Sequence, residues 1–556
     1  MKFFSLTFGF AGTRCSRALL PALLPALLPA LLPARLPTML PATVLTLLTL
    51  LSGCTVGPDY HRPELPVAAG YTAASDATVG ATDAAAPQHF VMGRDIPFAW
   101  WQQFHSPKLD ALVERALKAN PDITAAEAAL HQAQEYVIAQ QGFFYPTVNA
   151  SFTPTRNKLA GNQSSNAPGL QGNGTNISGN QNPNGPPYNA PVYYNFYTAQ
   201  LSLGYTPDVF GANRRAVESL QASADMARYQ MEATYISLSS NVVGAVIQLA
   251  ALKDQIRATQ SFIDDNARAD AILHQQLFLG YVMGIDVANQ DLALAQARQL
   301  LPPLMKQTRQ TRDLINALCG EMPDRSLDID ISLADLTLPA DLPLSLPSAI
   351  VEQRPDVRAA EEQLHAASAQ VGVAIAARLP QFSISAALGG AASEIPQMFK
   401  SGAPFWTIGG SLSQTLLDGG TLLHHQRAAE QALVGAQAQY RSAVISAFQN
   451  VADTLHAIQS DNDALTAATD AQKAAQVALA LTDQQYRAGY VNYQTLLAAR
   501  EAYQQLAVNM AQARANSLGD SVALFQALGG GWWHRNDAVT ATNPDLNTNK
   551  TTAANP

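Results

Sequence analysis

The stretch Arg354–Leu364 reads RPDVRAAEEQL and decides the fold, because Asn120–Leu130 reads NPDITAAEAAL with the same spacing, 234 positions earlier. A second motif, Gly280-Tyr281-Val282, returns as Gly489-Tyr490-Val491, here 209 positions later. The first copy therefore holds about 25 extra residues, which the polar run of residues 156–191 can contain. We infer an internally duplicated protein, since a repeat at a fixed offset indicates a repeated structural unit.

The first residues have the features of an export signal. Basic residues precede an apolar run at residues 44–51, which is too short to span a bilayer and ends in Leu51-Ser52-Gly53-Cys54. This tetrad resembles a bacterial lipobox, in which cleavage leaves Cys54 as a lipidated first residue. A signal peptide with an incidental cysteine is the alternative. No cofactor is expected apart from covalent lipid on Cys54, where several acyl chains together hold a membrane firmly.

Charge and composition exclude several classes of protein. After residue 53 the chain has 30 Lys and Arg against 43 Asp and Glu, a formal charge of −13 without a basic stripe, so we expect no nucleic-acid partner. Cys319 is left without a partner for a disulfide. No apolar run after residue 54 approaches the length of a membrane-spanning helix.

Active-site motifs are missing from the sequence. We find no glycine-rich phosphate loop, no nucleophile motif and no quartet of metal ligands. His424 and His425 are the only histidine pair, and neighbours in sequence point apart on a helix. The sequence therefore predicts neither an enzyme nor a metal site.

Four segments alternate apolar with small polar residues, at 148–153, 197–206, 382–388 and 406–413. Period two predicts strands with one apolar face. Such segments suit a transmembrane barrel with its apolar face outward, although a soluble sandwich has the same pattern. Four strands cannot close a barrel, and an open edge in lipid leaves backbone groups unpaired, so a barrel requires several chains.

Two long helices are predicted, at about 214–277 and 423–486. Apolar residues recur in steps of four and three, as at Leu238, Val242 and Ala245, which indicates a heptad seam. Each helix is ~100 Å long at 1.5 Å per residue. The other faces carry Gln, Asn, Ser and Ala with few charges, which suits the wall of a water-filled tunnel. A rod-like coiled coil is the alternative, but it would carry more Glu and Lys. Shorter helices return to about residues 318 and 528.

The order of the motifs resembles that of a known family. Val56-Gly57-Pro58-Asp59-Tyr60, Trp100-Trp101 with Phe104, the duplicated helices and Ala527-Leu528-Gly529-Gly530 are similar to the lipoprotein branch of the TolC/NodT-like outer-membrane factors of tripartite efflux pumps. The resemblance implies a mostly α-helical chain with a membrane β-barrel, in which a homotrimer forms a twelve-stranded barrel and a long helical barrel. It also implies a periplasmic adaptor protein, an inner-membrane transporter and outer-membrane lipid as partners.

The resemblance divides the chain into five parts. These are a lipoprotein signal peptide (1–53), a lipid-anchored extended leader (54–105), a first repeat (106–341), a second repeat (342–531) and a disordered tail (532–556). Threonine at position 55, rather than aspartate, fits the lipoproteins that are sent to an outer membrane. The expected location is the cell outer membrane, with the helices extending into the periplasm.

In the resembling family the turns after the long helices lie at the periplasmic tip, where the tunnel closes and the adaptor docks. The residues carried over to this gate are Gly280, Tyr281, Asp286, Arg487, Gly489, Tyr490 and Asn492. Many members hold an acidic residue beside the second turn, but residues 488–497 contain none. Asp286, Asp483 or an apolar Tyr490–Val491 constriction is therefore expected to restrict passage, and ordinary helix-turn packing is the alternative role for each residue.

We thus expect an outer-membrane channel that conducts small molecules, such as drugs and toxicants, out of the cell. The outer-membrane conduit of a type I protein secretion system is an alternative. A lipid-anchored coiled-coil spacer without a pore is another.

Overall fold

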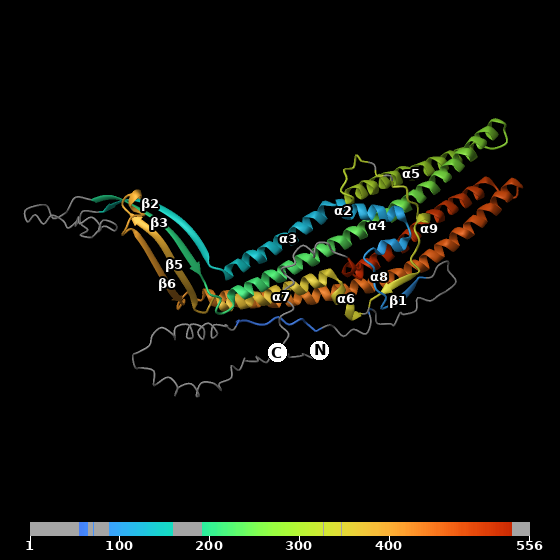
Figure 1. Cartoon of the computed structure of the whole chain (residues 1–556). Coiled ribbons are helices and arrows are strands. Elements are labelled where there is room, and N and C mark those ends of the chain that lie inside the picture. The colour runs from blue at the N-terminus through green and yellow to red at the C-terminus, as the bar shows by residue number, and fades with distance from the viewer. Residues whose placement is uncertain are drawn as a thin grey trace, which may run out of the picture. The chain divides into compact units, whose positions relative to one another are not determined.

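The computed structural model describes residues 55–64, 71, 88–159, 192–325, 327, 329–345 and 347–535. The predicted signal peptide and Cys54 lie outside the described residues, as do most of the loop at 156–191 and residues 536–556 of the predicted tail. The described helices are α2 Pro107–Ala119, α3 Pro121–Gln141, α4 Ala212–Phe278, α5 Gly284–Leu318, α6 Pro347–Gln353, α7 Pro355–Ala376, α8 Thr421–Arg487 and α9 Tyr493–Ala527 (Figure 1). The strands are β1 His89–Met92, β2 Thr147–Leu159, β3 Val192–Tyr205, β4 Asp341–Leu344, β5 Gln381–Ala392 and β6 Pro404–Ser413.

The duplication is confirmed element by element. The order helix, two strands, long helix, returning helix occurs first as α3-β2-β3-α4-α5 and then as α7-β5-β6-α8-α9. Helices α4 and α8 have 67 residues each, and α5 and α9 have 35 each. The predicted ends of the long helices are correct to within two residues, because a strong heptad pattern and a glycine stop define them.

Asn120 and Arg354, the first residues of the repeated stretch, have the same structural role in the two copies. Each precedes a helix that opens with proline, whose missing N–H is not needed at that position. The Asn120 amide nitrogen donates to the carbonyl of Leu318 at 3.0 Å, and the Arg354 guanidinium donates to that of Ala527 at 3.0 Å. Both carbonyls belong to the last residue of a returning helix and lack a partner within it. The repeated stretch therefore ties the start of one helix to the end of another.

The four long strands form one antiparallel sheet in the order β2-β3-β5-β6. The register sets Ala150 opposite Leu201, Leu201 opposite Leu388, and Leu388 opposite Trp406. One row of apolar side chains therefore crosses the whole sheet, as period two requires. Strands β2 and β6 each lack a partner on one side within the chain's described residues.

Helix α4 is the centre of the helical core, which packs α2, α3, α5, α7 and α9 against it. The predicted seam is confirmed, since Val242 and Leu249 are fully buried. Among the described helices, α4 alone has an 18-residue window apolar enough to cross a membrane, with a mean hydropathy of 1.5. Because 72% of that window is buried within the fold, its apolar side chains are accounted for by packing.

Trp100 and Phe104 also enter this core, and the Trp100 ring stacks on Phe525 of α9 at 5.2 Å. A short parallel pair, β1 with β4, joins the segment before Trp100 to the segment between the repeats. This pair was not predicted from the sequence, because four-residue strands carry too little alternation to be recognised.

Candidate functional site

The two turns predicted to form the gate have the same backbone geometry. Gly280 and Gly489 have φ of +76° and +78°, a left-handed conformation that glycine adopts without steric cost. The N–H groups of Tyr281 and Tyr490 each donate to a carbonyl five residues earlier, at 2.9 Å. This hydrogen bond, together with a glycine at that position, defines a Schellman motif, which ends a helix abruptly. The repeated Gly-Tyr-Val signal is therefore the reason that both long helices stop.

The tyrosines of the two turns face solvent. The exposed fraction of Tyr281 is 78% and that of Tyr490 is 83%, so neither ring is used to pack its own turn. Tyrosine and other aromatic side chains are enriched in the cores of protein interfaces. These two side chains are thus free to contact another chain.

Asp286 and Asn492 begin the returning helices. The Asp286 carboxylate accepts a hydrogen bond from the N–H of Met283 at 3.2 Å, and the Asn492 side-chain oxygen accepts one from the N–H of Thr495 at 3.0 Å. Both are helix-capping contacts, which satisfy backbone donors that the helix leaves open. Each residue thus has a local structural role within its turn.

Arg487 forms an ion pair with Asp483, with 2.7 Å between Nη2 and the carboxylate oxygen. Arg500 of α9 lies 3.9 Å from the other oxygen of that carboxylate. Asp483, one of the residues expected to restrict passage, therefore has its charge balanced by two guanidinium groups.

A buried polar network next to the turns was missed by sequence reasoning. The Tyr493 hydroxyl of α9 donates to Gln290 of α5 at 2.5 Å, and Gln290 donates to the carbonyl of Asn266 of α4 at 2.8 Å. Gln290 and Asn266 are fully buried, and burial raises the pKa of Tyr493 to about 12. The network joins the two hairpins, and only the pairing of helices from different repeats brings these residues together.

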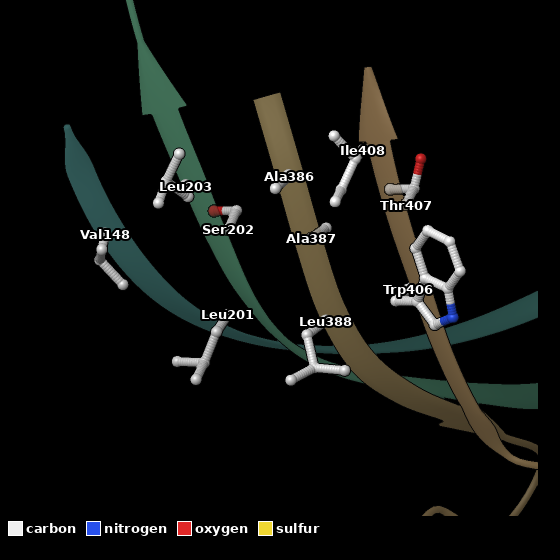
Figure 2. A pocket seen from close by; sticks show the side chains of 10 residues that line it. All are labelled: Val148, Leu201, Ser202, Leu203, Ala386, Ala387, Leu388, Trp406, Thr407 and Ile408. Carbon is white, nitrogen blue, oxygen red and sulfur yellow. The ribbon is translucent and has the colours of Figure 1, made fainter. Parts of the chain in front are cut away.

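The sheet carries the second functional surface. Val148, Leu201, Leu388, Trp406 and Ile408 are 52–72% exposed and line a shallow hollow of about 400 Å³ (Figure 2). The alternate residues of these strands, which lie on the opposite face of the sheet, are small and mostly polar. Among them, the Ser383 and Ser411 hydroxyls lie 2.7 Å apart. A contiguous exposed apolar face indicates a surface that something apolar covers. Strands of this length can cross a bilayer, so lipid can cover this face.

The leader motif Val56-Gly57-Pro58-Asp59-Tyr60 packs on α4 and α7. The Gly57 backbone touches that of Gly372 so closely that a Cβ on Gly57 would lie 2.4 Å from the Gly372 Cα. Asp59 forms an ion pair with Arg215 at 2.6 Å, and the Tyr60 ring stacks on His365 at 4.2 Å. The leader is thus held against the helical core at residues 57–60.

His365 beside this motif is set between two acids. Its ring nitrogens lie 3.3 Å from Glu362 and 3.1 Å from Glu218, and these contacts raise the pKa of His365. The protonated imidazole is therefore favoured where the leader meets the helices.

A family model described as "Outer membrane efflux protein" matches residues 112–321 and 346–530, one segment in each repeat. The chain belongs to this family. The pyoverdine export outer membrane protein OpmQ of Pseudomonas putida is 29% identical over 437 residues, which are 78% of this chain and 88% of that protein. The toluene efflux pump outer membrane protein TtgC of Pseudomonas putida is 26% identical, over 87% of this chain and 94% of that protein.

Solved channels have the same fold. The outer-membrane channel OprN is 28% identical, with a TM-score of 0.73 over 86% of this chain and 100% of OprN. The Campylobacter jejuni CmeC outer membrane channel is 22% identical, with a TM-score of 0.75 over 87% of this chain and 96% of CmeC, and it supports the fold alone. The predicted fold class, mostly α-helical and duplicated with strands for a trimeric membrane barrel, is confirmed.

Family membership also settles the broad function. The protein is an outer-membrane channel of an efflux system that extends into the periplasm, and it is not an enzyme. As an efflux channel it assembles as a trimer and works with a pump. The roles of Cys54 and of the seven gate residues stay predictions.

Proposed function

We propose that three copies of the chain form a conduit that receives small organic molecules from an inner-membrane transporter through a periplasmic adaptor. The names of OpmQ and TtgC refer to the export of pyoverdine and of toluene, and this supports small organic molecules, including toxicants, as cargo. The proposed repeats run from 106 to 341 and from 342 to 531. The expected boundary of the second repeat with the tail is residue 531.

The observation that carries this proposal is the pair of matching turns at Gly280 and Gly489. Each presents one exposed tyrosine at the end of a long helix, and each depends on a glycine with positive φ. The adaptor contacts these turns in the proposal, and their movement opens the tunnel, because a partner shifts an equilibrium only through contacts that differ between the closed and open states. Tyr281, Asp286, Arg487, Tyr490 and Asn492 complete the proposed gate.

The substitution Gly489→Pro tests the gate. Proline holds φ near −65° and has no N–H, so it fits neither the +78° of Gly489 nor its hydrogen bond to the carbonyl of Tyr486. We expect cells with this variant to accumulate fluorescent dyes as a deletion strain does, while trimers reach the outer membrane in normal amounts. Gly402→Pro is the matched control, since Gly402 has a φ of +96° in the β5–β6 connection. If the Gly489→Pro cells exclude dyes as wild type does, the gate assignment is wrong.

We further propose that Cys54 carries the lipid anchor. The support is the Leu51-Ser52-Gly53-Cys54 tetrad in the sequence, together with the motif at residues 56–60, which is held against α4 and α7. Cells fed labelled palmitate should label the wild-type chain and the Cys319→Ala variant equally, because the Cys319 thiol is buried. Cys54→Ala should abolish the label. Label retained in Cys54→Ala would contradict the proposed anchor.

A further inference from the structure

The two hairpins differ at one pair of corresponding positions. His274 and Asp291 of the first repeat lie 209 positions before Asp483 and Arg500 of the second. The second hairpin therefore holds an acid next to a permanent cation, whereas the first holds an imidazole and an acid. Asp270 adds a second carboxylate to the first hairpin, where the second has Leu479. The first hairpin thus gathers two carboxylates around one imidazole.

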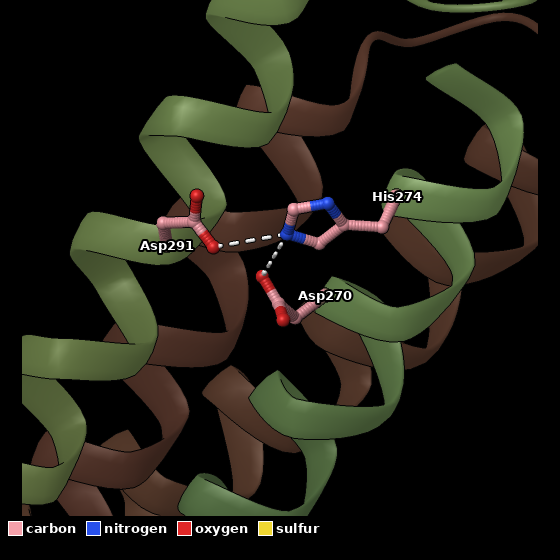
Figure 3. A group of neighbouring side chains, drawn as sticks. All are labelled: Asp270, His274 and Asp291. Atoms are coloured by element: carbon pink, nitrogen blue, oxygen red, sulfur yellow. Dashed lines mark hydrogen bonds and ion pairs between the residues drawn. The ribbon is translucent and has the colours of Figure 1, made fainter. Parts of the chain in front are cut away.

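These three side chains converge between α4 and α5 (Figure 3). Asp270 and His274 lie one turn apart on α4, on the same face, and Asp291 reaches them from α5. The His274 Nε2 atom lies 3.2 Å from an Asp291 oxygen and 3.8 Å from Asp270 Oδ1. One potential ligand atom from each residue lies within 4.8 Å of the others.

The spacing suits a tetrahedral ion. Bonds of about 2.0–2.2 Å to nitrogen and oxygen place neighbouring ligand atoms roughly 3.3–3.6 Å apart. The two His274 distances lie on either side of this range. Small side-chain rotations are therefore enough to bring the three atoms around one metal.

An independent observation also points to a ligand. Asp270 Oδ1, the oxygen that faces His274, is shielded from solvent and accepts no hydrogen bond from a donor in the described part of the chain. The Asp291 carboxylate lies close enough to bond to Asp270, which two carboxylates do only through a shared proton or a cation. A buried carboxylate oxygen without a partner is costly. Arg298 acts on Asp270 electrostatically, but it forms no ion pair with Asp270 or Asp291 in the described part of the chain. A cation between the three side chains would satisfy this oxygen.

We propose that Asp270, His274 and Asp291 form a site for a divalent transition-metal ion, with Zn²⁺ the best match to one imidazole and two carboxylates. The chain supplies three ligands, and water takes the fourth position, as in other open zinc sites. The bound ion joins α4 to α5 close to the Gly280 turn. This site rests on the side-chain geometry and not on the proposed cargo or adaptor.

The test uses the purified full-length trimer without a histidine tag. Isothermal titration with Zn²⁺ should give one ion per chain, and Co²⁺ should give the visible absorption of a tetrahedral complex. His274→Ala should weaken binding by roughly tenfold or more, since one of three protein ligands is lost. His456→Ala is the matched control, because His456 is an exposed histidine of α8 outside the cluster.

A second variant separates loss of the metal from loss of the fold. His274→Asp combined with Asp291→Arg rebuilds the ion pair of the second repeat, so the hairpin stays joined while the metal site is destroyed. This variant should keep the trimer and bind no Zn²⁺ at this site. Zn²⁺ binding that is absent from the wild-type protein, or unchanged in His274→Ala, would overturn the proposal.

Discussion

Gly57→Ala should release the leader from the helical core. The new Cβ would lie 2.4 Å from the Gly372 Cα, whereas ordinary contact begins at 3.4 Å, so the two backbones must separate by about 1 Å. Gly57 also has a φ of +102°, which an alanine adopts only with strain. Overpacking and left-handed strain together cost about 2–5 kcal/mol.

The contacts that hold the leader contribute a free energy similar to this strain. The Tyr60–His365 stack contributes about 0.5–1.5 kcal/mol, and the partly exposed Asp59–Arg215 and Arg62–Glu361 pairs about 0–1 kcal/mol each. Together these contacts contribute roughly 0.5–3.5 kcal/mol, which the strain matches or exceeds. We therefore expect the docked fraction of the leader to fall by about tenfold or more.

Hydrogen–deuterium exchange on the purified trimer measures this release. Peptides that cover residues 55–64 should exchange roughly tenfold faster in Gly57→Ala, while the centre of α4 stays protected. Gly93→Ala is the matched control, because Gly93 has a φ of +73° but nothing within 4 Å of its added Cβ. Equal protection of residues 55–64 in Gly57→Ala and wild type would refute the reasoning from this close contact.

Three further changes test the sheet, the core and the helices. Ile408→Arg should destabilise the barrel by about 2–4 kcal/mol if Ile408 faces the middle of the bilayer. Thr407→Arg, on the opposite face of the sheet, should have a smaller effect. The heat resistance of the trimer on gels will measure both. Trp100→Ala should cost about 3–5 kcal/mol, since the ring is buried against Phe525, and denaturant unfolding followed by tryptophan fluorescence will measure the loss. Burial and Asp461 raise the pKa of Asp520 to about 7, so the folded chain holds a proton that the unfolded chain has lost, and stability should fall as pH rises from about 4 to 7. Asp520→Asn should remove that fall in pH-dependent unfolding, and an unchanged slope would contradict the assignment.

The helices and strands were predictable because their signals are short in range. The ends of α4 and α8 follow from a heptad pattern and from a glycine two residues after the last helical residue. The sheet follows from period two in its strands, and the candidate turns follow from a motif that is repeated. None of these inferences needed to know which segments meet.

The sequence by itself determined the duplication, the four strands, the lengths of the helices and the positions of the two turns, since each depends on residues a few positions apart. Only the tertiary structure decided that Arg354 binds the end of α9, that Gly57 rests on Gly372, and that Asp270 and His274 meet Asp291. Such contacts depend on how two helices or segments are aligned along each other. A shift of one residue in that alignment turns a side chain to another face, and no local pattern in the sequence records it.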